Sequence, residues 1–286
     1  MNVALVGSSG YIAGFLLKGF TEENHIEKVL KIDQSEDADV YLDLSAATIF
    51  DYDILNKVDY IVFTAAISGP DKCASDFELC WDINVIGTSY FISQALRRNC
   101  KVLFFSSDAV FGDIPGEIYD ELSETRAETP YGKMKKAVED RFKSNSNFKA
   151  IRLSYVASAK DRFISYCINC INNGETADIF HPFYRNVIAV SDVVEVVIWF
   201  SKHWDEYEPC FLNVAGKELV SRVRMADELN RYFVGKLKYT ISSPGDNFYK
   251  NRPRITQMKS LYMREHEILE DNTFTEKIKK ELKGIM

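Results

Sequence analysis

A glycine-rich turn directly after the first predicted strand most constrains what this chain can fold into. An apolar segment at residues 2–6 leads into GSSG at residues 7–10, and a helical pattern follows at residues 11–20. Glycines let the backbone turn sharply and lie close to a ligand. The helix that follows offers unpaired N–H groups and the positive end of its dipole. The turn therefore predicts a binding site for the pyrophosphate of a dinucleotide.

The rest of the first half alternates short apolar segments with amphipathic ones. Strands are predicted at residues 2–6, 28–32, 40–42, 60–63, 101–105 and 149–153, and helices at residues 11–20, 84–98 and 131–144. This alternation is typical of a parallel sheet with helices on both faces. The predicted fold class is therefore α/β, with a Rossmann-type doubly wound parallel sheet.

The second half is less regular. Helices are expected at residues 161–174, 190–203, 223–232 and 272–282, and a strand at residues 211–214. The stretch at residues 237–241 is assigned to neither a helix nor a strand. We expect residues 1–156 to form the dinucleotide-binding domain, with the chain returning to it near residues 186–214. Most of residues 157–286 are expected to form a smaller C-terminal α/β domain that binds the substrate.

Composition excludes several classes of partner. The 286 residues carry a net charge of −7 without a basic stripe, which argues against nucleic acid or an anionic membrane surface as partner. We see neither a signal peptide nor a run of ~20 apolar residues. Six scattered cysteines suit reduced thiols, so a cytoplasmic location is expected.

Asp33 ends the second predicted strand, KVLKID. A carboxylate at this spacing can accept hydrogen bonds from the hydroxyls of the adenosine ribose, and it would repel a 2′-phosphate. NAD is therefore the expected cofactor, and NADP is less favoured. A solvated aspartate at a strand end is the alternative interpretation.

Tyr131 and Lys135 lie four residues apart in a predicted helix, so their side chains share one face. The ordinary pKa of a phenol is near ~10, and an adjacent ammonium together with the positive nicotinamide would lower it toward the range of a general acid–base. Ser107 lies at the carboxyl end of the strand KVLFF, where ligands bind in open α/β sheets. Its hydroxyl could hydrogen-bond the reacting oxygen.

Together these segments resemble the short-chain dehydrogenase/reductase superfamily, in its extended, NAD-dependent epimerase/dehydratase branch that modifies nucleotide sugars. The resemblance covers most of the chain. It rests on Asp33 and on the segments GSSGYIA, TAAISGP, DINVIGT, SSDAVFG, PYGKMK, RNVIAVSDVVEVV and FLNVAGKELVS.

The resemblance implies roles for individual residues. The implied catalytic residues are Ser107, Tyr131, Lys135 and Asp108. The implied cofactor contacts are Gly7, Ser9, Gly10, Tyr11, Ile12, Ala13, Asp33, Asp43, Leu44, Ala65, Ala66, Asn84, Ser106, Tyr131 and Lys135. The implied substrate contacts are Ser107, Asp108, Arg185, Arg252 and Arg254, although Arg252 and Arg254 are equally well interpreted as surface charges. A homodimer built on the helices at residues 84–98 and 131–144 is also implied.

The residues after Ser107 bear on the reaction. The 4,6-dehydratases of this branch carry an Asp-Glu pair there, whereas this chain has Asp108 followed by Ala109. The pattern Ser-Asp-x-Val-Phe is more similar to reductases of the dTDP-4-dehydrorhamnose reductase type. We therefore expect an NAD(P)-dependent reductase of a nucleotide-linked 4-keto sugar. An NAD-dependent epimerase with tightly held cofactor and a non-catalytic, dinucleotide-binding regulatory subunit remain alternatives.

Two further patterns have plain interpretations. The four histidines lack the spacing of metal ligands, so no metal is expected. Cys167 and Cys170 form a C-x-x-C pair within an apolar pattern of helical period. They are interpreted as two thiols on a half-buried helix rather than as a redox or zinc motif.

Overall fold

A seven-stranded parallel sheet forms the centre of the protein. The computed structural model describes residues 1–114, 116–270 and 272–285. The strands follow the order β12-β7-β5-β4-β1-β2-β3, and every pairing is parallel. They are β1 (Asn2–Val6), β2 (Lys28–Asp33), β3 (Val40–Tyr41), β4 (Tyr60–Phe63), β5 (Lys101–Ser107), β7 (Phe148–Leu153) and β12 (Phe211–Val214). The predicted Rossmann-type sheet is confirmed.

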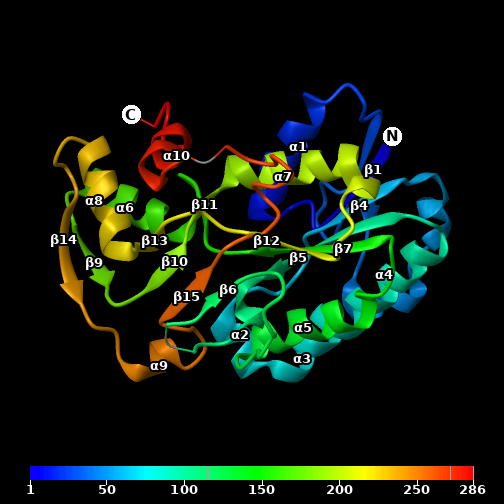
Figure 1. Ribbon diagram of the computed structural model, residues 1–286, viewed down its shortest axis with the longest axis horizontal. Helices are drawn as coiled ribbons and strands as arrows, with labels where there is room; N and C mark the ends of the chain where they lie inside the picture. The colour runs from blue at the N-terminus through cyan, green and yellow to red at the C-terminus, as the bar shows by residue number, and fades with distance from the viewer. Residues whose placement is uncertain (115, 271, 286) are drawn as a thin grey trace.

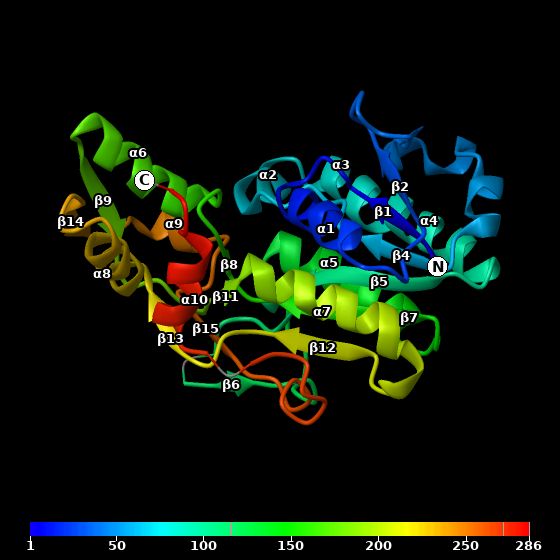
Figure 2. The same ribbon diagram turned by 90° about the horizontal axis from the view of Figure 1, so that it is seen from above.

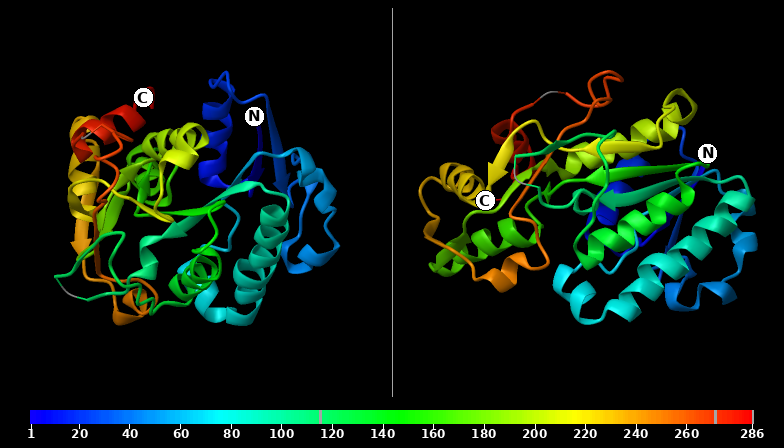
Figure 3. Two further views of the ribbon diagram at one scale, coloured as in Figure 1. Left: turned by 45° about the vertical axis from the view of Figure 1, so that its right-hand side comes forward. Right: turned by 60° about the horizontal axis from the view of Figure 1, so that its bottom comes forward.

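Helices cover both faces of this sheet, as Figure 1 shows. The first face carries α1 (Tyr11–Thr21) and α7 (Val190–His203), which share one apolar core with the strands. The second face carries α4 (Thr88–Arg97) and α5 (Pro130–Phe142), which run side by side in Figure 3 and pack into a second core. Because both faces are buried, the central strands are continuous apolar runs rather than alternating ones.

The glycine turn after β1 requires glycine at its first position. Gly7 has φ +88°, and a Cβ atom there would lie 2.6 Å from the backbone nitrogen of Ala65. A side chain would therefore clash with the end of β4 as well as strain the backbone. The turn thus joins β1 tightly to α1 and holds it beside β4.

The helix predicted at residues 84–98 differs from expectation at its start. A π-helical segment, η3 (Asp82–Gly87), precedes α4, and the short helices α2 (Pro70–Ser75) and α3 (Phe77–Trp81) come before it. A Cβ atom on Gly87 would lie only 1.8 Å from the carbonyl oxygen of Leu44, which opens the 3-10 helix η1 (Leu44–Ile49). This contact between distant segments is invisible to helical periodicity.

A smaller lobe packs beside the sheet, and Figure 2 separates the two parts. It has its own apolar core, which includes Cys167 and Cys170 as two buried thiols on one helix, as predicted. Its helices are α6 (Arg162–Asn173), α8 (Arg222–Tyr232), α9 (Asp246–Tyr249) and α10 (Phe274–Glu281). Its strands are β8 (Val156–Ala157), β9 (Thr176–Phe180), β10 (Tyr184–Asn186), β11 (Ile188–Ala189), β13 (Leu219–Ser221), β14 (Lys238–Ser242) and β15 (Ile255–Met258).

The sequence patterns predicted α6, α8 and α10 of this lobe, but neither the four-residue helix α9 nor the strands. The strands have two to five residues and pair with distant segments, so they carry little local signal. The C-terminal helix begins at Phe274 rather than at residue 272, because the Thr273 side chain caps it by accepting a hydrogen bond from the Glu276 N–H.

The chain crosses between the two parts several times. Strand β12 belongs to the seven-stranded sheet, and helix α7 packs on it. Ile268, from the C-terminal segment, packs into the same core as α7. In the other direction, β6 (Ile118–Tyr119) leaves the first half and pairs with β15. None of the helices within the described ranges is long and apolar enough to cross a bilayer.

The contact at Gly87 makes a testable prediction about stability. We expect Gly87→Ala to lower the free energy of unfolding by about 2 kcal/mol or more, because the added methyl group must displace backbone. Gly14→Ala on α1 is the matched control: no other segment lies within 4 Å of the place its methyl group would take, so its stability should stay level or rise slightly. Urea unfolding of both variants checks this, and equal midpoints would contradict it.

Candidate active site

The first of two cavities lies at the glycine turn. It measures about 300 Å³, and its lining includes seven predicted cofactor contacts: Gly7, Ser9, Gly10, Asp33, Leu44, Ala65 and Ala66. Gly10 is the N-cap of α1 and has no side chain to bond the first-turn amides. These N–H groups, which belong to Tyr11, Ile12 and Ala13, therefore remain for a ligand. The residues present fit a dinucleotide pyrophosphate.

Asp33 faces the turn from the end of β2. Its carboxylate accepts hydrogen bonds from the Ser9 backbone N–H and hydroxyl, both at 2.9 Å, and from the Ser35 N–H at 3.1 Å. The position suits a carboxylate that receives ribose hydroxyls. Asp43 does not line this cavity. It caps η1 by accepting from the N–H and hydroxyl of Ser45, and these bonds lower the pKa of its carboxyl.

Four other predicted cofactor contacts, Tyr11, Ile12, Ala13 and Asn84, bond to or pack against other parts of the protein. The Tyr11 hydroxyl donates to Ser158 at 2.5 Å, which ties α1 to the smaller lobe. Ala13 is fully buried against the sheet, and Ile12 packs on the same core. The Asn84 amide exchanges two hydrogen bonds with the backbone of Ile67, at 2.8 and 2.9 Å, and so shapes the loop after β4.

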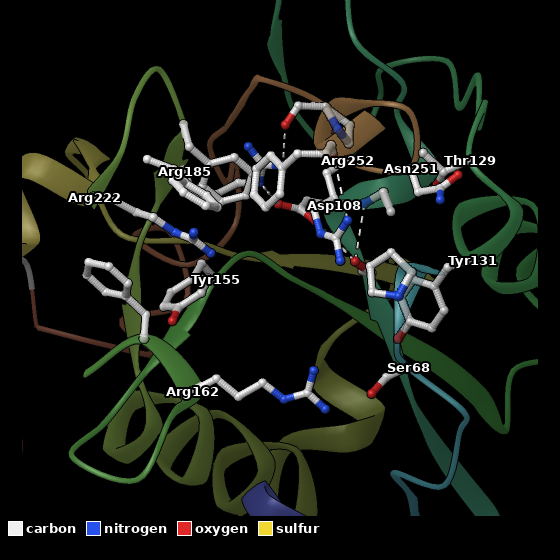
Figure 4. Close-up of a pocket in the computed structure, with 18 of the residues that line it drawn as sticks. Ser68, Asp108, Thr129, Tyr131, Tyr155, Arg162, Arg185, Arg222, Asn251 and Arg252 are labelled. Atoms are coloured by element: carbon white, nitrogen blue, oxygen red, sulfur yellow. Dashed lines mark hydrogen bonds and ion pairs between the residues drawn. The ribbon is translucent and has the colours of Figure 1, made fainter. Parts of the chain in front are cut away.

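The second cavity, of about 740 Å³, lies where the carboxyl end of β5 meets the smaller lobe, and Figure 4 shows its walls. Ser107 and Tyr131 both line it. Thr129 caps α5 by accepting a hydrogen bond from the Gly132 N–H at 3.2 Å, and Pro130 occupies the first turn. A Cβ atom on Gly132 would lie 2.2 Å from the Ala109 carbonyl oxygen. Glycine at this position therefore lets α5 begin close to Ser107.

Lys135 lies beneath Tyr131 rather than in the cavity wall. It is 3% exposed, its ammonium donates to the Phe105 carbonyl at 2.7 Å, and it lies 5.6 Å from the centre of the Tyr131 ring. Burial lowers the pKa of Lys135 to about 7, against the attraction of Glu139.

The protein's own groups raise the pKa of Tyr131. Burial is the largest cause, and Cys73 and Asp108 add to the increase, whereas the lowering expected from sequence also involves the positive charge of a bound nicotinamide. Desolvation disfavours the phenolate more than one partly neutralised ammonium favours it. Tyr131 therefore keeps its proton at neutral pH and can act as a proton donor.

Asp108 and Arg185 form a pair in the wall of the cavity. Arg185 Nε lies 3.5 Å from the Asp108 carboxylate, which also accepts from the Ser107 hydroxyl at 3.1 Å. The remaining Arg185 nitrogens donate to the carbonyls of Tyr184 and Pro253 at 2.6 and 2.7 Å. Burial lowers the Arg185 pKa and raises that of Asp108, while each partner opposes the shift of the other. Most of the charge of Arg185 is thus already compensated.

Of the two other predicted substrate arginines, only Arg252 reaches this cavity. Its guanidinium binds both oxygens of Asp71 on α2, at 2.8 and 2.5 Å, and joins the smaller lobe to the large one. Arg254 lines neither of the two cavities. Its side chain lies over the Tyr249 ring and pairs with the fully exposed Asp246 at 3.4 Å.

Two arginines that the sequence analysis missed also line the cavity. Arg162 begins α6 and points into the open space opposite Tyr131, and Arg222 begins α8. Neither guanidinium has a hydrogen bond or an ion pair with any residue in the described ranges, and the Nε atom of Arg222 is buried without a partner. No motif marked them, because only the packing of the lobe brings both helix starts to one cavity.

The two cavities together can serve a redox reaction at an oxygen-bearing carbon. One holds donors for a dinucleotide. The other holds a phenol, a serine hydroxyl and two guanidinium groups without an ion pair among the described residues, and that of Arg222 lies over the rings of Phe163 and Phe183. Among the described residues, no cluster of three or more His, Cys, Asp or Glu side chains could hold a metal ion.

Solved structures share this arrangement of elements at low sequence identity. A dTDP-4-dehydrorhamnose reductase from Clostridium acetobutylicum has a TM-score of 0.84 at 21% identity, with 99% of this chain and 98% of that chain covered. A UDP-glucuronic acid 4-epimerase from Bacillus cereus, solved with UDP-glucuronic acid and NAD, has a TM-score of 0.81 at 16% identity, with 98% of each chain covered. A dTDP-4-dehydrorhamnose reductase from Bacillus anthracis, solved with NADP, has a TM-score of 0.82 at 18% identity, with coverage of 98% and 97%.

These similarities establish the fold. Comparison with curated protein sequences gives no significant match. The model of the NAD dependent epimerase/dehydratase family matches residues 3–215, which include the glycine turn, Ser107, Tyr131 and Arg185. This match spans most of the chain, and it confirms the resemblance predicted from the motifs. The chain belongs to the NAD-dependent epimerase/dehydratase family.

Proposed function

We propose that the protein is a reductase of a nucleotide-linked 4-keto sugar, with NAD(H) as its cofactor. One observation carries the proposal: Ser107 and Tyr131 line one cavity, directly above the buried side chain of Lys135. The glycine turn provides a separate cavity for a dinucleotide. When bound, the reduced nicotinamide supplies the hydride.

The side chains of this chain supply the remaining elements of the reaction. The Ser107 hydroxyl hydrogen-bonds the oxygen of the ketone and orients it. Tyr131 donates its proton to that oxygen as the carbon receives the hydride, so the ketone becomes an alcohol. Lys135 stabilises the phenolate that remains, until a proton from solvent restores the phenol.

The residues around Tyr131 favour reduction over dehydration. Reduction of a ketone consumes a proton, and burial keeps Tyr131 protonated. Dehydration needs an additional base beside Asp108, but Ala109 occupies the next position. Asp108 itself is engaged by Arg185 and Ser107. The presence of the whole Ser107, Tyr131 and Lys135 set favours an enzyme over a non-catalytic subunit.

The free guanidinium groups suit the diphosphate of a nucleotide sugar. Asp108 compensates Arg185, and Asp71 compensates Arg252. Arg162 and Arg222 remain, and their two positive charges match the two negative charges of a diphosphate ester. We therefore assign the diphosphate to Arg162 and Arg222, in place of the contacts first expected from Arg185 and Arg254.

Removal of the Tyr131 hydroxyl tests the proton donor. We expect Tyr131→Phe to lower kcat by about 10²- to 10⁴-fold, because the oxygen of the ketone loses its proton source. Affinity for NAD, measured by calorimetry, should change less than about twofold. Tyr90→Phe, on the exposed side of α4, is the control and should keep full activity. A Tyr131→Phe enzyme with near-normal kcat would remove this residue from its role.

The carboxylate at the end of β2 tests the choice of cofactor. We expect Asp33→Ala to weaken the preference for NAD over NADP by about tenfold, since a 2′-phosphate would no longer meet a negative charge. Asp37→Ala, on the loop that follows β2, removes the same charge without lining the cavity. Kd values for both cofactors check this, and an unchanged ratio in Asp33→Ala would place the selectivity elsewhere.

The diphosphate assignment predicts a selective effect on substrate binding. Arg222→Gln and Arg162→Gln should each raise the KM for the nucleotide sugar by about 10- to 100-fold, the scale of one charged hydrogen bond. Arg224→Gln is the control on the same helix, because Arg224 pairs with Glu228 and does not line the cavity. If KM stayed at the parental value in both pocket variants, the anion would lie elsewhere.

A further inference from the structure

Helix α5 carries a third functional candidate below Tyr131 and Lys135. Glu139 follows Lys135 by four residues, so all three side chains share one face of the helix. Glu139 is only 2% exposed and lies in the layer between α5 and the sheet. A carboxylate at this depth must be compensated, because its desolvation is costly.

Two partners from adjacent strands meet the Glu139 carboxylate. The Ser106 hydroxyl on β5 donates to it at 2.5 Å. The Arg152 guanidinium on β7 donates through Nε at 3.1 Å and through Nη2 at 2.8 Å. Ser106 and Arg152 are direct partners in the register of β5 and β7. Glu139 therefore joins α5 to two neighbouring strands at one level of the sheet.

Consecutive residues of β5 are thereby attached to α5. The Phe105 carbonyl accepts from Lys135 at 2.7 Å, and the next residue, Ser106, binds Glu139. Ser107 follows immediately and enters the cavity that Tyr131 lines. The Ser106 side chain thus contacts Glu139 in the core, and not the cofactor cavity, although it was predicted as a cofactor contact. These two bonds set the position of Ser107 along the strand relative to Tyr131 on the helix.

Glu139 is also the negative charge that faces Lys135. The groups around the Lys135 ammonium are Glu139 and Tyr131 from α5, the Cys73 thiol from α2, and the Phe104 ring and the Phe105 carbonyl from β5. Burial lowers the pKa of Lys135, and Glu139 gives the larger of the two opposing effects, ahead of Cys73. A buried ammonium without this carboxylate would lose its proton at lower pH.

We propose that Glu139 is a positioning residue, which acts through Ser106 and Lys135 to hold Ser107 against Tyr131 and to keep the ammonium beneath the phenol charged. The proposal rests on the proposed function for its kinetic consequences only. A buried ion pair of this kind adds little to stability compared with apolar side chains of the same volume. A purely structural role and a positioning role therefore predict different results in a variant that still folds.

The experiment compares Glu139→Gln, the double variant Glu139→Gln with Arg152→Met, and Asp140→Asn. Glu139→Gln leaves the Arg152 charge buried and unpaired, so the double variant secures a folded protein. Asp140 is the next residue of α5 and is exposed, and within the described part of the chain it pairs with Lys136 and Lys143 alone, so Asp140→Asn is the control. Two measurements are made on each: the pH dependence of kcat for reduction, and the titration of the Lys135 Cε signal by NMR of lysine-labelled protein without cofactor.

Removal of the negative charge favours deprotonation of the groups beside it. The double variant also loses the Arg152 charge, but Glu139 and not Arg152 is among the groups that act on the pKa of Lys135. We therefore expect the Lys135 titration, and with it the alkaline limb of the pH profile of kcat, to move to lower pH by about 0.5 to 2 units in the double variant, with kcat at pH 7 reduced at least about tenfold. The KM should change less than kcat, because Arg162 and Arg222 are untouched. Asp140→Asn should match the parent protein in both measurements.

Parental titration of Lys135 and a parental pH profile in the folded double variant would overturn the proposal. The NMR titration also separates it from the proposed function. If the parent protein reduced no 4-keto nucleotide sugar, the proposed function would fail. An unshifted Lys135 titration would then still refute the role of Glu139, and a shifted one would still support it.

Discussion

The hydrogen bond from the Lys135 ammonium to the Phe105 carbonyl connects the two elements on which the active site depends. One is β5, which ends in Ser107, and the other is α5, which begins beside Tyr131. The bond is buried and involves a charge, so it is both directional and costly to break. Gly132 and the Thr129 cap bring the start of α5 close enough for it to form. The catalytic geometry therefore follows from the packing of one helix on one strand.

The charges of the large cavity show how the smaller lobe completes this geometry. Arg185 and Arg252, both expected to bind substrate, are compensated by Asp108 and Asp71 within the protein. The contact between Arg252 and Asp71 joins the lobe to α2 and forms part of the cavity rim. Arg162 and Arg222 keep their charge for a ligand. The lobe thus contributes both the contacts that hold it in place and two guanidinium groups in the cavity wall, to which we assign the diphosphate.

Much of the site was predictable because its motifs are local. The turn with Gly7 and Gly10, Asp33 at a strand end, and Tyr131 with Lys135 on one helical face each lie within a few residues of a recognisable element. Arg162 and Arg222 were missed because they belong to different helices of the irregular half and meet only in the folded lobe. The rise in the pKa of Tyr131 within the protein was not foreseen, because burial of a phenol depends on neighbours such as Cys73, which the sequence does not place.

The sequence by itself determined the doubly wound sheet, the dinucleotide turn and the catalytic helix, because apolar periodicity, glycine and i, i+4 spacing act over short distances. The tertiary structure decided which arginines are free, how deeply Lys135 lies, and that Glu139 meets Ser106 and Arg152 across two strands. It also decided the π-helical segment η3 before α4 and the close approach of Gly87 to Leu44. Each of these features depends on burial away from water or on contact between distant segments, and both arise only when the chain has folded.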